Sequence, residues 1–285
     1  MISAAGVGAW GSKPSRTLFA LATLVSTSST CRRTAALSAA GDAGLSSIGT
    51  WGGLRARTAG ERRHPRQVVI LLHGWGAPGD DLLPLADVLA APGRLFVFPE
   101  APLVSPGGGR AWWQLDITRL MAARERGEER DLREETPPGL AEARAKVTAL
   151  VAELSQRTGV APSSIWVGGF SQGAMLATDV ALASPAAVGG LVVMSGSLIS
   201  ETTWTARLKS WAPSFPVFQS HGRGDPILPF RLAETLHDRV QAQQRDIVWV
   251  PFDGGHEIPP VVLGALQTFL TAHAGAAPPD GSRAH

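Results

Sequence analysis

Three side chains that can cooperate in acyl transfer occur along the chain in the order serine, aspartate, histidine. Ser171 lies in the pentapeptide Gly-Phe-Ser-Gln-Gly, residues 169–173. Asp225 lies in His-Gly-Arg-Gly-Asp-Pro, residues 221–226, and His256 lies in a later Gly-His pair. In such a set the serine oxygen attacks a carbonyl carbon, the imidazole removes the serine proton, and the carboxylate orients the imidazole. The residue types therefore predict nucleophilic catalysis by a serine.

Each of these residues also has a plainer interpretation. A bare G-x-S-x-G match occurs by chance in about one chain in four of this composition, and it is then a plain strand-to-helix turn. Taken alone, Asp225 is a residue that closes a turn or caps the next helix, and His256 is a surface histidine. Asp253 is a rival acid, but it precedes His256 by three residues and would have to reach round its own loop. We therefore prefer Asp225 on geometry.

The segments that precede these residues predict how they are positioned. Short apolar runs that suit strands buried on both faces lie at residues 68–72, 95–98, 165–168, 191–195, 216–220 and 247–252. Helices are expected at residues 80–91, 139–158, 172–182, 229–243 and 260–272. This alternation predicts an α/β fold, with a mostly parallel central sheet and helices on both faces. Ligands bind at the carboxyl ends of the strands in such sheets, and each member of the triad directly follows a different predicted strand.

The serine lies in the setting of a nucleophile elbow, between the predicted strand at 165–168 and the predicted helix at 172–182. Such a turn forces Ser171 into a strained backbone conformation. Side chains in place of Gly169 and Gly173 would collide with neighbouring elements. The helix directs its first amides, and the positive end of its dipole, at the serine oxygen.

A second turn offers donors for the oxyanion that forms during acyl transfer. The sequence His-Gly-Trp-Gly, residues 73–76, follows the first predicted strand. Its backbone amides could donate to an oxyanion, and the second donor in this architecture is the amide of Gln172. We expect His73 itself to brace the loop rather than to react.

From about residue 50 to residue 273, the chain resembles the phospholipase/carboxylesterase family, which includes the acyl-protein thioesterases. The resemblance rests on residues 71–76, 169–173, 221–226 and 255–256, and on the Trp-Trp-x-x-Asp pattern of residues 112–116. It implies a compact α/β-hydrolase without a large cap domain that acts on carboxylic esters or thioesters. In this sequence the serine comes first, then the aspartate and then the histidine, which is also the order of these residues in α/β-hydrolases.

By the same resemblance, Ser171, Asp225 and His256 form the catalytic triad, and the backbone amides of Trp75 and Gln172 form the oxyanion hole. The expected function is that of a serine carboxylic-ester hydrolase for short- to medium-chain acyl esters. A lysophospholipase or an acyl-protein thioesterase is the nearest alternative. A non-catalytic binding protein of the same fold is the alternative of another class.

Aromatic side chains are the candidates for an acyl pocket. Residues 102–113 are rich in glycine and end in two tryptophans, so we expect a flap against the active site. Trp75, Trp112, Trp113 and Phe170 are the expected substrate-binding residues of an apolar groove. The alternative is that these aromatic side chains belong to the core.

Composition excludes several other classes of function. The 285 residues are 44% hydrophobic and 18% charged, which supports a sizeable core and excludes wholesale disorder. The net charge of +2 is small and the basic residues are scattered, so no nucleic-acid partner is expected. No apolar run reaches about 18 residues, so no stable membrane insertion is expected. The single cysteine excludes a disulfide framework, and the histidines lack ligand spacing. We therefore expect no metal and no cofactor, a small acyl ester or thioester as substrate, and a monomer or homodimer.

The two ends of the chain are expected to lie outside the catalytic domain. That domain is expected at residues 49–274, with a flexible tail at 275–285. Residues 1–48 are interpreted as a flexible extension or a signal segment, with an apolar run at 18–25. The extension is the favoured interpretation, so the cytoplasm is slightly favoured over export. The charged segment 119–135 is expected to be a solvent-exposed loop. The recruitment of an acidic partner by this segment is the less favoured alternative.

Overall fold

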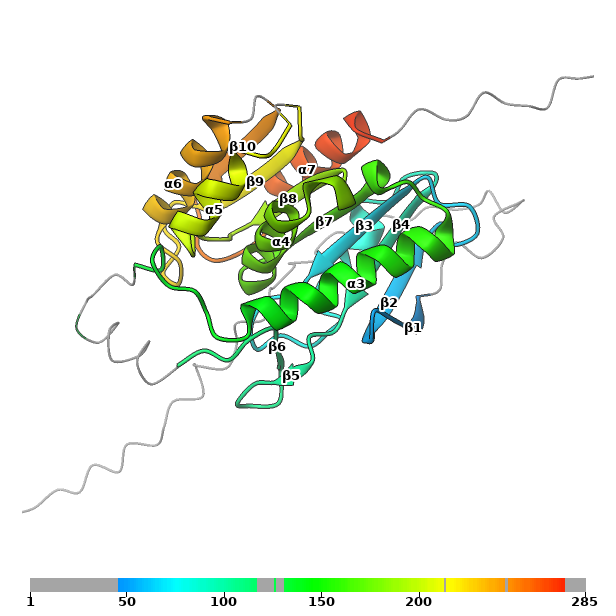
Figure 1. Cartoon of the computed structure of the whole chain (residues 1–285), viewed down its shortest axis with the longest axis horizontal. Helices are drawn as coiled ribbons and strands as arrows, with labels where there is room; N and C mark the ends of the chain where they lie inside the picture. Colours follow the sequence, from blue (N-terminus) through cyan, green and yellow to red (C-terminus); the bar gives the residue numbers. More distant parts are fainter. Residues whose placement is uncertain (1–45, 117–125, 127–130, 213, 244–245, 275–285) are drawn as a thin grey trace, which may run out of the picture.

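The computed structural model describes residues 46–116, 126, 131–212, 214–243 and 246–274. Within them, eight strands form one twisted sheet in the order β1-β2-β4-β3-β7-β8-β9-β10 (Figure 1). The strands are β1 Ser47–Trp51, β2 Leu54–Gly60, β3 Gln67–Leu72, β4 Arg94–Pro99, β7 Ile165–Phe170, β8 Gly190–Met194, β9 Val217–Gly222 and β10 Ile247–Phe252. Neighbours from β4 through β10 are parallel, whereas β1–β2 and β2–β4 are antiparallel. The expected α/β fold with a mostly parallel sheet is confirmed.

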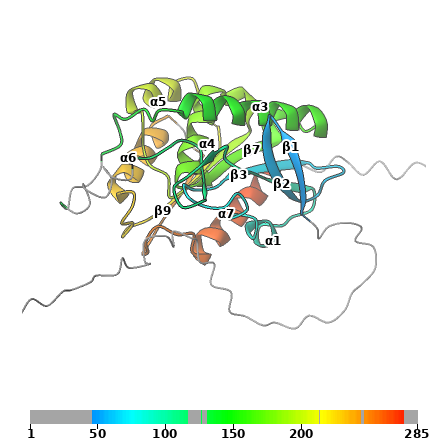
Figure 2. The same ribbon diagram turned by 90° about the horizontal axis from the view of Figure 1, so that it is seen from below.

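Helices cover both faces of the sheet (Figure 2). They are α1 Leu85–Val88, α3 Leu140–Thr158, α4 Gln172–Ala183, α5 Glu201–Leu208, α6 Phe230–Gln241 and α7 Pro260–Ala272. Alternate residues of each strand point to opposite faces. In β3, accordingly, Val68 and Ile70 join the core layer that includes α3 and α4, whereas Val69 and Leu71 join the layer that includes α1 and α7. Burial on both faces explains why the central strands are almost entirely apolar.

The expected strands all occur, within two residues of the predicted bounds. The helices expected at 139–158, 172–182, 229–243 and 260–272 are also confirmed. The helix expected at 80–91 is wrong, because only Leu85–Val88 is helical. Pro84 stands at its N-cap, and a proline cannot donate the N–H that an earlier start would require. Residues 78–83 instead form turns in which Asp81 N–H donates to Pro78 O and Leu83 N–H donates to Asp80 O.

Two strands that the sequence did not predict, β1 and β2, form a hairpin at the edge of the sheet. Gly52 and Gly53 connect them with φ of 56° and 74°, the left-handed pair that a tight hairpin favours. Arginine, threonine and alanine fill β2, so its apolar alternation is weak. Helix α5 was not predicted either.

Several expectations lie outside the described residues. They concern the N-terminal segment with the run at 18–25, the tail at 275–285 and most of the charged segment 119–135. Of the helices in the described part of the chain, none has the length and apolar character that crossing a bilayer requires.

Candidate active site

Ser171 lies at the sharp turn between β7 and α4, where it takes the N-cap position of the helix. Its φ of 55° and ψ of −119° are strained for a residue with a side chain. A Cβ at Gly169 would lie 2.5 Å from Leu72 O, and one at Gly173 would overlap the same carbonyl. The two glycines therefore let the turn pack against the end of β3, as the sequence predicts for a nucleophile elbow.

Asp225 and His256 meet beyond the carboxyl ends of β9 and β10. Asp225 Oδ2 accepts a hydrogen bond from His256 Nδ1 at 2.6 Å. Asp225 Oδ1 accepts the N–H groups of Ile227 at 2.8 Å and Leu228 at 2.9 Å. The carboxylate is completely buried and the imidazole is 5% exposed. Both groups are therefore fixed in orientation.

The environment of Asp225 keeps it ionised. Burial alone would raise its pKa, but the hydrogen bonds from His221 and His256 and from the backbone outweigh burial, and the pKa lies well below the usual range. An ionised carboxylate only accepts hydrogen bonds, so Nδ1 of His256 carries the proton. Nε2 of His256 is then the basic nitrogen of the ring.

His256 lies beside the nucleophile turn. Its ring centroid is 4.7 Å from that of Phe170, the residue directly before Ser171. Nε2 is buried and has no hydrogen-bond partner among the described residues, so it is not bonded to Ser171 in this conformation. Catalytic hydrogen bonds are often long before substrate binds and shorten in the reactive complex. The arrangement thus places the buried imidazole of His256 against Phe170, the residue directly before Ser171.

The rival acid, Asp253, does not share this environment. Its side chain is 98% exposed, and it is paired with Arg223 at 3.9 Å. A solvated carboxylate of this kind is a poor orienting group for an imidazole. The geometry therefore favours Asp225 as the partner of His256.

His221 is a second partner of Asp225 that the sequence did not predict. Its Nε2 lies 3.3 Å from Asp225 Oδ2 and 2.9 Å from Leu228 O, and its side chain is completely buried. The carbonyl oxygen can only accept, so Nε2–H donates to it. The sequence feature that could have indicated this contact is the spacing of four residues between His221 and Asp225 in one short turn segment.

His73 braces the loop after β3, as expected. Nε2 accepts the N–H of Ala101 at 3.1 Å, and Nδ1 lies 2.8 Å from Gly74 O. The Nε1–H of Trp112 donates to His73 O at 3.0 Å. Burial lowers the pKa of His73, which favours the neutral ring that this pattern requires.

The two amides expected in the oxyanion hole belong to Trp75 and Gln172. Gly76 N–H donates to Arg110 O and Ala77 N–H donates to Gly74 O, whereas the Trp75 N–H donates to no backbone carbonyl of the described chain. Gln172 is the first residue of α4, where helical N–H groups lack an intrahelical acceptor. Both amides are therefore available to a ligand.

The side chain of Gln172 has a role that the sequence did not indicate. Its Oε1 accepts the N–H of Trp112 at 2.9 Å, and its Nε2 donates to Trp113 O at 2.9 Å. Gln172 is itself 1% exposed. This amide bracket joins the residue after the nucleophile to residues 112–113.

The expectation of an aromatic groove is corrected in part. Trp112 and Trp113 are each 1% exposed and lie in the hydrophobic core, which is the alternative that the sequence left open. Phe170 is 4% exposed and packs against His256, whereas Trp75 is partly exposed. Large aromatic side chains bury the most apolar area, and here burial in the core accounts for both adjacent tryptophans.

The expected flap at residues 102–113 contains a small hairpin, β5 Leu103–Val104 paired with β6 Arg110–Ala111. Gly76 N–H donates to Arg110 O at 2.8 Å, and Arg110 N–H donates to Ala77 O at 2.9 Å. The hairpin is thus bonded to the loop that carries Trp75. Within the described ranges, no group of three or more histidine, cysteine or carboxylate residues could hold a metal ion.

Comparison with known proteins gives a consistent result. The family model described as phospholipase/carboxylesterase matches residues 55–274. The chain is 32% identical over 237 residues to acyl-protein thioesterase 1 of Eremothecium gossypii, which covers 78% of this chain and 94% of that protein. It is 30% identical to a probable carboxylesterase of Oryza sativa subsp. japonica, over 73% of this chain and 78% of that protein. Its structure is similar to the crystal structure of esterase PE8, with a TM-score of 0.61, 29% identity, and coverage of 73% and 93%.

Proposed function

Because this chain belongs to the phospholipase/carboxylesterase family of α/β-hydrolases, we propose that it is a serine hydrolase that cleaves short- to medium-chain acyl esters. The family and the names of its relatives indicate a hydrolase of acyl esters or thioesters. The serine mechanism, the triad and the chain length are our proposal. A single observation carries the proposal, namely the buried Asp225–His256 hydrogen bond of 2.6 Å beside the strained turn of Ser171.

In the first half of the reaction, His256 Nε2 takes the proton of Ser171 as the serine oxygen bonds to the acyl carbon. Asp225 holds the ring in the required tautomer and stabilises the imidazolium. The amides of Trp75 and Gln172 donate to the tetrahedral oxyanion, and losing one such donor would cost about 3 kcal/mol.

In the second half, the tetrahedral intermediate collapses, and His256 gives its proton to the departing alcohol or thiol. The acyl group remains bonded to Ser171. Water then attacks this acyl-enzyme, with His256 again as the base, and releases the carboxylic acid with the serine restored. In this mechanism Ser171 and then water act as nucleophiles, His256 transfers the protons, and the two backbone amides stabilise the oxyanions.

The partly exposed Trp75 is our proposal for a substrate contact, with Phe170 holding the imidazole. A thioester substrate is the second candidate, because the relative from Eremothecium gossypii is named as an acyl-protein thioesterase. The same oxyanion hole and the same base would serve both substrate classes. The leaving group and the length of the acyl chain decide between them.

A fluorophosphonate probe tests the nucleophile. We expect the native chain to be labelled and Ser171→Ala to remain unlabelled, because the probe bonds to an activated serine. Ser210→Ala is a matched control, since Ser210 is an exposed serine whose hydroxyl donates to Arg207 O. Equal labelling of the native chain and Ser171→Ala would refute the proposal and favour a non-catalytic binding protein. Hydrolysis rates with oxygen esters and thioesters of increasing acyl length then define the substrate class.

A further inference from the structure

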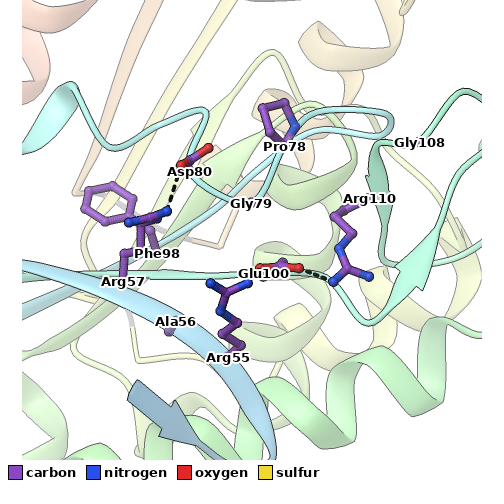
Figure 3. A pocket seen from close by; sticks show the side chains of 10 residues that line it. All are labelled: Arg55, Ala56, Arg57, Pro78, Gly79, Asp80, Phe98, Glu100, Gly108 and Arg110. Atoms are coloured by element: carbon purple, nitrogen blue, oxygen red, sulfur yellow. Dashed lines mark hydrogen bonds and ion pairs between the residues drawn. The ribbon is translucent and has the colours of Figure 1, made fainter. Parts of the chain in front are cut away.

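A pocket of about 230 Å³ lies beside the loop that continues from Trp75, outside the proposed triad. Strand β2 forms one wall, the end of β4 the floor, and residues 78–80 and the β5–β6 hairpin the other walls (Figure 3). Liquid water occupies about 30 Å³ per molecule, so this volume corresponds to about eight waters. The pocket therefore has room for a small ligand or for one end of a larger one.

Three guanidinium groups surround this pocket, and they outnumber its carboxylates. Arg55, Arg57 and Arg110 line it together with Asp80 and Glu100. Arg55 and Arg57 are two residues apart in β2, so both extend from the same face of the strand. The three guanidinium groups and the two carboxylates leave an excess of one positive charge at this position.

Glu100 is shared by two of the arginines. Its Oε2 lies 3.3 Å from Arg55 Nη1, and its Oε1 is paired with Arg110 Nη2. Asp80 Oδ2 lies 3.2 Å from Arg57 Nη2. Each guanidinium has five N–H donors, and among the described residues each is paired with one carboxylate. An incoming anion could therefore bind to the other donors of these groups.

Two of the three arginines are partly withdrawn from water. Arg57 and Arg110 are 33% and 31% exposed and Glu100 is 18% exposed, whereas Arg55 is 59% exposed. Charge-assisted hydrogen bonds are stronger where water is excluded, and the planar guanidinium suits carboxylate and phosphate oxygens. Phe98 and Ala56 line the same pocket, so it also has an apolar part.

We propose that the pocket formed by Arg55, Arg57 and Arg110 binds an anionic group, a carboxylate or a phosphate. The anion bridges the guanidinium groups and competes with Glu100, which pairs with two of them. Two sources share this chemistry, namely a free anion and the charged end of a substrate. Arg110 is bonded through its backbone to Gly76 and Ala77, so an occupied pocket contacts the loop that carries the Trp75 amide.

Titration calorimetry with inorganic phosphate tests the pocket on the full chain. We expect saturable binding with a Kd of about 1 mM or tighter, weakened at least about tenfold in the double variant Arg55→Gln/Arg57→Gln. Arg157→Gln is the matched control, because it removes one positive charge from an exposed arginine on α3. We expect it to bind phosphate as the native chain does. Absence of saturable binding to the native chain, or equal binding by the double variant, would overturn the proposal.

Glu100→Gln gives a second test, in which the affinity for phosphate is expected to rise rather than fall. It is nearly isosteric and removes the carboxylate that competes for Arg55 and Arg110, so we expect phosphate to bind about threefold to tenfold more tightly. Weaker binding would contradict a site in which the guanidiniums hold the anion. These phosphate titrations do not depend on hydrolysis. Their outcome can therefore contradict the anion pocket without contradicting the proposed esterase activity, and the reverse also holds.

Hydrolysis rates then identify the source of the anion. A matched pair of esters, one neutral and one with a terminal carboxylate, is compared in the native chain and in Arg55→Gln/Arg57→Gln. A selective loss of kcat/KM for the charged ester supports an anionic substrate. An equal effect on both esters, with phosphate binding lost, supports a separate small anion.

Discussion

His221 and His256 both place a ring nitrogen on the same oxygen of Asp225, at 3.3 Å and 2.6 Å. The other carboxylate oxygen accepts the N–H groups of Ile227 and Leu228. Three N–H donors and the neighbouring ring of His221 therefore surround one buried carboxylate. Such a carboxylate has little freedom to rotate, so it can fix the direction in which His256 presents its Nε2.

Replacing the acid of the triad tests the assignment. We expect Asp225→Asn to lower kcat by about 10⁴-fold, because an amide leaves the imidazole in the wrong tautomer. Asp253→Asn is the matched control, since its side chain is 98% exposed, and we expect its effect to be small. Steady-state kinetics on one ester checks both variants. The opposite ranking would transfer the role of the acid to Asp253.

His221 is predicted to act as a positioning residue. His221→Leu removes a hydrogen bond near an ionised carboxylate, an effect of about 1.4 kcal/mol, so we expect kcat/KM to fall about tenfold. His221→Gln keeps a donor at this position and should recover most of the activity. If both variants lower the melting temperature equally yet keep full kcat/KM when folded, His221 has only a structural role.

The low pKa of Asp225 predicts how stability depends on pH. Its ordinary pKa is 3.8, and the folded value is lower, so the full stabilisation is present above about pH 4. As the pH falls below 3.8, the unfolded state takes up the proton first and the stabilisation is lost, by up to about 1.4 kcal/mol per pH unit.

Denaturant unfolding of the native chain and of Asp225→Asn, measured from about pH 6 to about pH 3, checks this dependence. We expect the difference in unfolding free energy to shrink towards the acid end, because the amide cannot titrate. A difference that stays constant over the whole range would show that Asp225 does not stabilise the fold through its charge.

Much of this fold could be predicted from the sequence, because the strands buried on both faces are continuous apolar runs. The apolar residues of β3 and β8 give such a run regardless of what packs against them. The hairpin of β1 and β2 was not predicted because alternate residues of both strands are partly or fully exposed, and β2 alternates arginine with small residues, so neither strand is a continuous apolar run. The error at residues 80–91 arose because the Gly-Asp start at residues 79–80 was given more weight than Pro84.

The site was predictable to the extent that it follows from chain topology. Ser171, Asp225 and His256 each lie shortly beyond the carboxyl end of a different strand, so a parallel sheet brings them to one edge. Side-chain contacts between distant segments do not follow from topology. The two hydrogen bonds from the Gln172 side chain to residues 112–113 join segments about sixty residues apart in the sequence, and no local sequence pattern predicts them.

That bracket supplies a prediction of its own. Gln172→Leu leaves the N–H of Trp112 and the carbonyl of Trp113 buried without partners, so we expect a loss of about 2 to 4 kcal/mol in unfolding free energy. The freed segment is also bonded to Gln172, whose amide we propose as an oxyanion donor, so kcat/KM should fall in the folded protein. Unfolding curves and kinetics measured together check both effects. Unchanged values in both assays would contradict the bracketing role.

A buried carboxylate outside the site ties three helices together. Asp179 of α4 is 2% exposed, and it pairs with Arg144 of α3 at 2.6 Å and Arg207 of α5 at 2.9 Å. It also accepts the Nε1–H of Trp204 at 3.0 Å. Since α4 begins directly after Ser171, this cluster anchors the helix that follows the strained turn at Ser171.

Asp179→Asn keeps the shape of the side chain and removes the charge. Two arginines then lose their anion, so we expect the unfolding free energy to fall by about 2 to 3 kcal/mol, less than for a wholly buried pair because the arginines are 26% and 30% exposed. Glu234→Gln, at an exposed position of α6, is the control for loss of one negative charge and should have little effect. Chemical denaturation checks both variants. Equal stability of Asp179→Asn and the native chain would mean that desolvation of the carboxylate offsets its ion pairs, as happens in some buried clusters.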